Sequence, residues 1–151
     1  MKHIKTLTHE FVEHIPSDLD DGKIYVSMTF ATAIHKCCCG CGQEVVTPIS
    51  PTDWKLIFDG QSISLYPSIG NWSLPCQSHY WIERNMVKWA PRWSQKKINT
   101  GRAYDVFNKE RYLSEVIAQN VYDEHENTSV KMTKGNTKKG LWQKIKKLRH
   151  D

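Results

Sequence analysis

Residues 35–42 read His35-Lys36-Cys37-Cys38-Cys39-Gly40-Cys41-Gly42, so four of the chain's five cysteines lie within five positions. The fifth follows in the segment Cys76-Gln77-Ser78-His79. Thiolate and imidazole groups are the ligands that Zn²⁺ takes in tetrahedral protein sites. A disulfide framework explains the pattern less well, because the cysteine count is odd and adjacent cysteines rarely bridge. The sequence therefore predicts a metal site, with zinc as the ion.

The spacing of the cysteines requires the chain to bend. Cys37, Cys39 and Cys41 alternate, so an extended chain would place them on one face with about 6.6 Å from each to the next. Thiolates that share one zinc lie closer together, because each Zn–S bond is about 2.3 Å long. The chain must therefore curl, and Gly40 and Gly42 permit this because glycine accepts positive φ angles.

Six side chains are candidate ligands, and the sequence leaves open which four bind. They are His35, Cys37, Cys39, Cys41, Cys76 and His79. Cys38 is out of phase with its neighbours and is predicted to be a non-ligand, although Cys38-x-x-Cys41 is also a spacing found in zinc sites. The competing interpretation is a set of buried, reduced cysteines that act as small hydrophobic residues, and it fits Cys38 well.

Length and charge favour one folded domain followed by a tail. The 151 residues are 39% hydrophobic and include 6 tryptophans, which is enough for a core. Residues 128–151 hold 8 basic residues and one acidic residue, whereas residues 1–127 hold 13 basic and 15 acidic residues. A basic groove for nucleic acid is therefore not indicated in the domain.

The sequence shows no membrane or export signal. No stretch approaches the ~18–20 apolar residues of a membrane span. Residues 1–20 contain charges throughout, so they lack the apolar region of a signal peptide. We therefore expect no transmembrane segment and a cytoplasmic protein.

Period-two patterns predict β-strands between residues 23 and 90. The predicted strands are residues 23–28, 31–35, 54–58, 61–66, 80–82 and 86–89. Asp59-Gly60 joins two of them and suits the positive φ angles of a type I′ hairpin turn. The buried face of that hairpin is expected to consist of Leu56, Phe58, Ile63 and Leu65. We expect a mainly β fold of the α+β class, a small antiparallel sheet or sandwich held by one zinc site, with a C-terminal helix and a basic tail.

The pattern changes after the last predicted strand. Residues 103–120 carry apolar residues near helical spacing and predict a helix. Residues 123–139 are polar and are interpreted as a flexible linker, and residues 141–148 as a short amphipathic helix. The predicted organisation is a zinc-binding β-rich domain over residues 1–122 and a flexible basic tail over 123–151. The tail is interpreted as solvated or partner-dependent, with contact to an anionic membrane surface or nucleic acid as the alternative.

Several segments together resemble one known family. They are Phe11-Val12-Glu13 with Pro16, Gly22 with Tyr25-Val26-Ser27, His35-x-Cys37-x-Cys39-Gly40-Cys41-Gly42, Thr47-Pro48, Trp54, Leu65-x-Pro67-Ser68-Ile69-Gly70-Asn71-Trp72 and Cys76-x-Ser78-His79-Tyr80-Trp81-Ile82. Over residues 9–90 the chain is similar to a small metal-binding family of undefined function, whose genes lie beside bacterial ubiquitin-like proteins and their activating and conjugating enzymes. The resemblance implies a peptidase that processes or removes the ubiquitin-like modifier. Cys38 departs from the family pattern, which usually has a small residue other than cysteine there.

A zinc peptidase needs an open coordination position for water and a general base. Thiolate-rich sites are more often closed and structural, but three bound ligands out of six would leave a position open. We expect Glu13 to be the base, because burial among Phe11, Val12 and Ile15 would raise its pKa. Ser78 is the expected oxyanion donor. The simpler interpretation is a solvated Glu13 and a Ser78 that caps a turn.

Two functional hypotheses follow. The first is a zinc-dependent peptidase that acts on the tail of a bacterial ubiquitin-like protein. The second is a non-catalytic, zinc-stabilised module that binds this modifier or its conjugating enzymes. Three protein ligands plus water favour the first hypothesis, and four ligands with at least three thiolates favour the second. A nucleic-acid-binding zinc knuckle is a weaker third hypothesis, because the domain is close to neutral.

Overall fold

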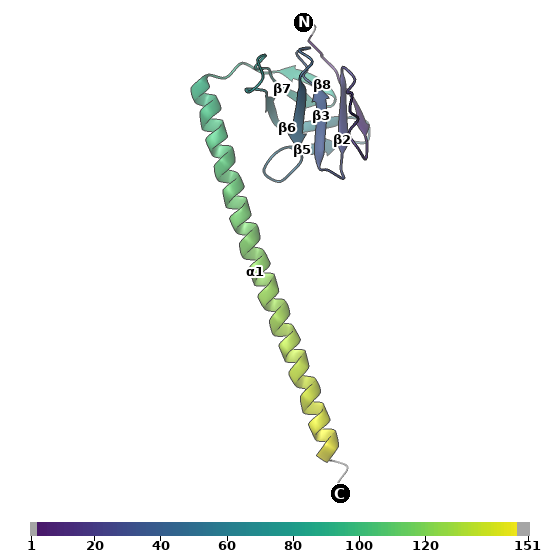
Figure 1. Cartoon of the computed structure of the whole chain (residues 1–151), viewed down its shortest axis with the longest axis vertical. Coiled ribbons are helices and arrows are strands. Elements are labelled where there is room, and N and C mark those ends of the chain that lie inside the picture. Colours follow the sequence, from purple (N-terminus) through teal and green to yellow (C-terminus); the bar gives the residue numbers. More distant parts are fainter. Residues whose placement is uncertain (1–2, 148–151) are drawn as a thin grey trace. The chain divides into compact units, whose positions relative to one another are not determined.

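Over its described residues the chain folds into two four-stranded β-sheets followed by a helix (Figure 1). The computed structural model describes the backbone of residues 3–147 and the side chains of residues 3–123. The elements are β1 (Thr8–Phe11), β2 (Lys23–Ser27), β3 (Thr32–Lys36), β4 (Glu44–Pro48), β5 (Lys55–Phe58), β6 (Ile63–Gly70), β7 (His79–Glu83), β8 (Met86–Trp89) and α1 (Gln95–Lys147). The expected mainly β fold with a C-terminal helix is confirmed.

The first sheet has the strand order β1-β2-β3-β4. β1 runs parallel to β2, and the other neighbouring strands are antiparallel. β2 is buried on both faces, because Ile24 and Val26 face the main core while Tyr25 packs against Leu19 and Ile34 on the opposite face. Two predicted strands are thus confirmed as β2 and β3, whereas β1 and β4 are additional to the prediction.

The second sheet is an antiparallel meander in the order β5-β6-β7-β8. Both of its predicted hairpins are confirmed, but the turn geometry differs from the prediction. Asp59-Gly60 lies in a longer loop, since Phe58 pairs with the first residue of β6 across residues 59–62, and Gly60 has a φ angle of 94°. The two-residue turn with positive φ at both positions instead joins β7 to β8, at Arg84 (49°) and Asn85 (63°).

The core lies between the two sheets. Its buried residues include Ile24, Val26, Ala33 and Val45 from the first sheet and Ile63, Leu65, Ile69, Tyr80, Ile82 and Val87 from the second. Full burial of one such side chain contributes about 1.5–3 kcal/mol. Phe58 was expected in this core, but it is 49% exposed. It lies on an edge strand, where its ring contacts that of Phe11 with 5.1 Å between centroids.

β6 bulges next to β7, because the register of the two strands shifts between Leu65 and Ile69. Leu65 pairs with Ile82, and Ile69 pairs with Tyr80. Residues 66–68 of β6 therefore lie opposite a single residue of β7. The bulge contains the cis peptide bond Tyr66-Pro67, and a proline cannot donate a ladder hydrogen bond. Bulges re-aim side chains, often beside active sites.

α1 begins at a capping serine. The Ser94 hydroxyl accepts a hydrogen bond from the backbone N–H of Lys97 (3.4 Å), and its carbonyl accepts one from Ile98 (3.0 Å). Serine is a favoured residue at this position because its oxygen satisfies an otherwise unpaired N–H group. Ile98 is 5% exposed, so the first turns of α1 are partly buried.

The helix is longer than the sequence predicts. It contains the predicted stretch 103–120 and continues through residues 123–139, where a linker was expected, because no proline interrupts the chain after residue 91. Residues 141–147 belong to the same helix, while Leu148 lies outside the described residues. Residues 1–105 and 106–151 form separate compact units, and the division at residue 122 stays a prediction. No helix in the described part of the chain is long and apolar enough to cross a membrane.

Candidate functional site

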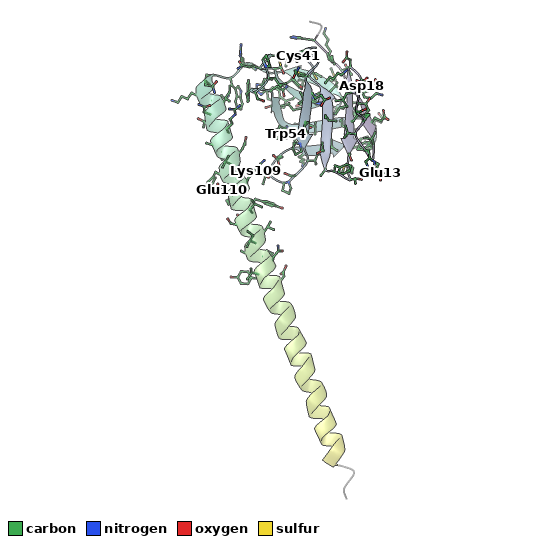
Figure 2. All side chains as sticks on the ribbon, viewed as in Figure 1. Glu13, Asp18, Cys41, Trp54, Lys109 and Glu110 are labelled. Atoms are coloured by element: carbon green, nitrogen blue, oxygen red, sulfur yellow. The ribbon has the colours of Figure 1, made fainter. Side chains whose placement is uncertain are left out.

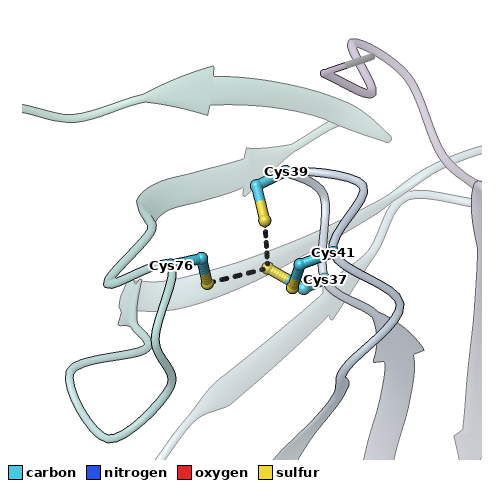
Figure 3. A group of neighbouring side chains, drawn as sticks. All are labelled: Cys37, Cys39, Cys41 and Cys76. Carbon is cyan, nitrogen blue, oxygen red and sulfur yellow. Dashed lines mark hydrogen bonds between the residues drawn. The ribbon is translucent and has the colours of Figure 1, made fainter. Parts of the chain in front are cut away.

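Four cysteines gather at one end of the sandwich. The sulfur atoms of Cys37, Cys39, Cys41 and Cys76 all lie within 4.8 Å of one another (Figure 3). The Sγ atom of Cys37 is 3.4 Å from that of Cys39 and 3.9 Å from that of Cys76. All four thiols are free. Four sulfur atoms at this separation suggest a metal site.

Two loops bring these cysteines together. Cys37, Cys39 and Cys41 follow the end of β3, and Cys76 lies in the loop between β6 and β7. The expected curl of the first loop is confirmed, since Gly40 and a glycine two residues later have φ angles of 81° and 75°. One hydrogen bond from the Gly40 N–H to the Cys37 carbonyl (3.0 Å) lies within this loop.

Cys38 lies outside the cluster. Its side chain is fully buried in the main core, and its carbonyl accepts a hydrogen bond from the N–H of Ile4 (2.8 Å). Burial raises the pKa of this thiol to about 12, although a hydrogen bond with Tyr80 works in the opposite direction. Cys38 therefore behaves as a small core residue.

His35 is not brought to the cysteine cluster. Its ring is buried, and Nε2 lies 2.8 Å from the hydroxyl oxygen of Tyr80. Nδ1 has no hydrogen-bond partner among the described residues. Burial lowers the pKa of His35 to about 4, so the ring is neutral at physiological pH.

Ser78 lies beside the cysteine cluster. Its Oγ atom is 3.1 Å from the Cys37 sulfur and 3.6 Å from the Cys76 sulfur. The side-chain amide of Asn71 donates a hydrogen bond to the same Oγ atom (2.8 Å). The backbone N–H of Asn71 also donates to the Ser78 carbonyl (2.9 Å), which closes the loop that carries Cys76. Ser78 thus contacts the cysteine cluster and the loop that carries Cys76, and its role as an oxyanion donor stays a prediction.

The pKa values of the thiols differ within the cluster. Burial raises the pKa of Cys37 and of Cys39. Burial also acts to raise the pKa of Cys76, but hydrogen bonds from Ser78, Cys39 and Cys41 outweigh it and lower that pKa to about 7. Metal ligation requires thiolates, so metal binding would release protons from the buried thiols.

His79, predicted as a metal ligand, instead forms a pair with a serine. Its Nε2 atom is 2.9 Å from the hydroxyl oxygen of Ser68, and its Nδ1 atom is 2.8 Å from the carbonyl oxygen of Pro91. A carbonyl oxygen only accepts, so Nδ1 donates this hydrogen bond, and in the neutral tautomer Nε2 accepts the hydrogen bond of Ser68. This is the arrangement of a nucleophile, a general base and a group that orients the base.

Neighbouring strands β6 and β7 bring Ser68 and His79 together. Gly70 at the end of β6 pairs with His79 at the start of β7. Ser68 precedes Gly70 within the bulged segment and is partly buried. A side chain at residue 70 would collide with Trp72, because an added Cβ atom would lie 2.3 Å from the indole Nε1. Glycine is therefore required there by the close approach of the tryptophan.

Three tryptophans surround the His79 ring. The centroid distances are 5.0 Å to Trp72, 5.6 Å to Trp81 and 5.1 Å to Trp93. His79 itself is 4% exposed. The imidazole is thus fixed by two hydrogen bonds at its nitrogen atoms and by aromatic rings around it.

Glu13 is far from these groups. Its side chain is exposed, and its carbonyl accepts a hydrogen bond from Ser27 at the end of β2 (2.7 Å). Cys37 follows the end of the antiparallel strand β3, so Glu13 and the cysteines lie at opposite ends of this sheet. Figure 2 shows the same separation between Glu13 and Cys41. The apolar surroundings expected for Glu13 are not found, and the structure does not support its role as a base for water held at the cysteines.

A hydrogen-bonded serine–histidine pair of this kind is typical of enzymes that catalyse acyl transfer. Residues 11–90 match the family described as "Bacterial ubiquitination-like system serine protease (BubE)". The chain belongs to this family. No curated protein and no solved structure matches it. The match includes Ser68, His79 and all four clustered cysteines, and it ends one residue before Pro91.

The family description corrects one expectation and supports another. It names a serine protease, so the metallopeptidase type expected from the sequence is not supported. A peptidase role in a bacterial ubiquitination-like system agrees with the expectation. Ser68, the partner of His79, was not among the site residues expected from the sequence, although Pro67 beside it is a signal for a bulge at that point.

Proposed function

We propose that this protein is a serine peptidase in which Ser68 is the nucleophile and His79 is the general base. The observation that carries the proposal is the 2.9 Å contact between Ser68 Oγ and His79 Nε2, together with the 2.8 Å contact that orients the ring. Both residues lie in the segment that matches the serine protease family. The Pro91 carbonyl would hold the Nδ1–H proton in the place that an acidic side chain holds in many serine peptidases.

The proposed reaction has two steps. Ser68 Oγ attacks the carbonyl carbon of the scissile bond while its proton moves to His79 Nε2. The histidine then gives this proton to the leaving amine, and an ester between Ser68 and the acyl group of the substrate remains. Water attacks the ester in the second step, with His79 again accepting a proton, and the serine is restored.

The cysteine cluster has a structural role in this proposal. We infer that it binds Zn²⁺, because four cysteine sulfurs are the ligand set of closed structural zinc sites. Four thiolates leave no position for a reacting water, and the zinc-water mechanism expected from the sequence also lacks a nearby base. The metal would instead hold the loop of residues 71–78 against residues 37–41. That loop carries Trp72 and leads directly into His79.

The substrate class follows from the system to which the family belongs. We propose that the acyl group is the C-terminal tail of a bacterial ubiquitin-like protein, released from a precursor extension or from a conjugated amine. The conjugating enzymes of the same system are proposed as further partners. Five free thiols suit a reducing compartment, so we propose that the activity is cytoplasmic.

The test is a cleavage assay on a ubiquitin-like precursor from the same system, with the products weighed by mass spectrometry. The wild type should cleave at one bond, and Ser68→Ala should not. Ser73→Ala is the matched control, because Ser73 is exposed in the neighbouring loop. A wild type that binds the precursor and never cleaves it would favour the non-catalytic binding module. Full activity of Ser68→Ala would overturn the proposed nucleophile.

A further inference from the structure

His79 can act as a base only if its ring keeps one orientation. Two hydrogen bonds lie at its ring nitrogens, and one of them is to Ser68 itself. The other, to the Pro91 carbonyl, fixes Nδ1. These two bonds leave the faces of the ring open to contacts with other side chains. The orientation of the ring therefore depends on these two bonds and on the side chains that pack against its faces.

Trp93 packs against this ring from outside the two strands that carry the catalytic pair. The Trp93 and His79 rings meet edge to face, with 5.1 Å between centroids and an interplanar angle of 75°. Trp93 also stacks on Trp72, with 5.6 Å between centroids and an angle of 23°. Trp72 in turn contacts His79 at 5.0 Å. The three rings form a closed triangle, so movement of Trp93 would free both His79 and Trp72.

The first turns of α1 hold Trp93 in place. The ammonium group of Lys97 lies 4.4 Å from the centroid of the Trp93 ring. A Cβ atom added at Gly101 would lie 3.4 Å from the same ring, so the tryptophan lies directly against the helix backbone there. Ile98 between these two residues is buried. Trp93 is thus fixed by Trp72 on the side of the sheet and by the start of the helix.

We propose that Trp93 is a positioning residue that holds the His79 imidazole toward Ser68, so that the start of α1 completes the catalytic site. This inference rests on the proposed serine mechanism. It concerns a residue beyond the segment that matches the family, since the match ends at residue 90. Misplacement of a catalytic group by about 1 Å can reduce the rate by about 10²-fold. We therefore expect Trp93→Ala to lower the rate at which Ser68 reacts by about 10- to 100-fold.

The test is a double-mutant cycle read by the rate at which a fluorophosphonate labels Ser68, measured by intact mass. This readout follows the reactivity of Ser68 and needs no modifier protein. Trp93→Ala should slow labelling in the wild-type background and have no further effect in the His79→Ala background, because it acts through His79. Trp93→Phe should retain most of the rate, since a ring remains against the histidine. Trp89→Ala is the control, because Trp89 contacts His3 and Tyr80.

The outcomes separate this inference from the mechanism on which it rests. Equal slowing by Trp93→Ala with and without His79 would show a general structural effect and overturn the inference. Labelling of Trp93→Ala at the wild-type rate would also overturn the inference, and Ser68 and His79 would keep their proposed roles. If Trp93→Ala does not fold, the labelling rates of Trp93→Phe and Trp93→Leu are compared instead. Slower labelling of Trp93→Leu supports the inference, and equal rates overturn it. Absence of Ser68 labelling in the wild type would instead refute the proposed function.

Discussion

Replacement of Cys76 by serine should remove the metal and loosen the loop that precedes His79. Cys76 is the one clustered cysteine that comes from the loop between β6 and β7, whereas the other three lie within residues 37–41. A metal held by both groups therefore cross-links residue 41 to residue 76. A cross-link that closes a loop of about 35 residues stabilises a fold by about 4 kcal/mol in the chain-entropy model.

This loss is large for a domain of this size. Small domains have unfolding free energies of about 5–15 kcal/mol, and 1 kcal/mol corresponds to about 4–8 °C in melting temperature for a domain of 60–100 residues. Cys76→Ser should therefore lower the melting temperature by at least about 15 °C and reduce the bound metal from about one equivalent to near zero. A strong chelator should have a similar effect on the wild type, because the binding free energy of a structural metal contributes to folding.

The assay combines metal analysis with thermal unfolding followed by circular dichroism. Cys38→Ala is the matched control, since Cys38 is a buried cysteine in the same loop and lies outside the cluster. The control should keep its full metal content. A Cys76→Ser variant that retained one metal equivalent and the wild-type melting temperature would refute the assignment of Cys76 as a ligand. Full metal loss in Cys38→Ala would refute the separation of Cys38 from the site.

Two further predictions concern the hairpin loop and the C-terminal helix. Hydrogen bonds from the Gln61 and Ser62 backbone N–H groups and from the Ser62 hydroxyl lower the pKa of Asp59 to about 2. The stabilisation from ionised Asp59 is thus present above its unfolded pKa of about 3.9 and lost as the pH falls toward 2. Asp59→Asn should flatten the pH dependence of stability between about pH 4 and 2 in acid titrations; an unchanged profile would contradict this. Truncation after Asn127 should leave the metal content and the β-sheet dichroism unchanged, and loss of metal would show that the C-terminal residues support the domain.

Much of the sandwich follows from short-range patterns in the sequence. The hairpin of β7 and β8 is predictable because apolar residues lie on both sides of the polar stretch Glu83-Arg84-Asn85. The cysteine cluster is predictable because its glycines let closely spaced thiols turn toward one point. β1 is harder to predict, since it is short, pairs in parallel and is mostly exposed. Its position depends on a partner that is distant in the sequence.

The proposed catalytic pair of Ser68 and His79 could not be predicted from the same patterns. Ser68 and His79 are 11 residues apart in the sequence, and they lie on neighbouring strands whose register shifts between Leu65 and Ile69. A ladder continued from the Leu65–Ile82 pair would place Ser68 opposite His79, whereas the shifted register pairs Gly70 with it, so the sequence pattern alone does not show which residues surround the histidine. His79 follows Cys76 by three residues, so it also fits a metal-ligand pattern. Its hydrogen bonds to Ser68 and Pro91 favour the role of a base over that of a metal ligand. Phe58 was misplaced because strand alternation does not reveal that β5 is an edge strand.

The most direct test of the serine mechanism is site-specific labelling of the metal-loaded wild type with a fluorophosphonate. The account predicts one adduct per chain, mapped by peptide mass spectrometry to the peptide that contains Ser68. The adduct should be absent from Ser68→Ala and present in Ser73→Ala. No adduct on the wild type, or an adduct that persists in Ser68→Ala, would contradict the assignment of Ser68 as the nucleophile.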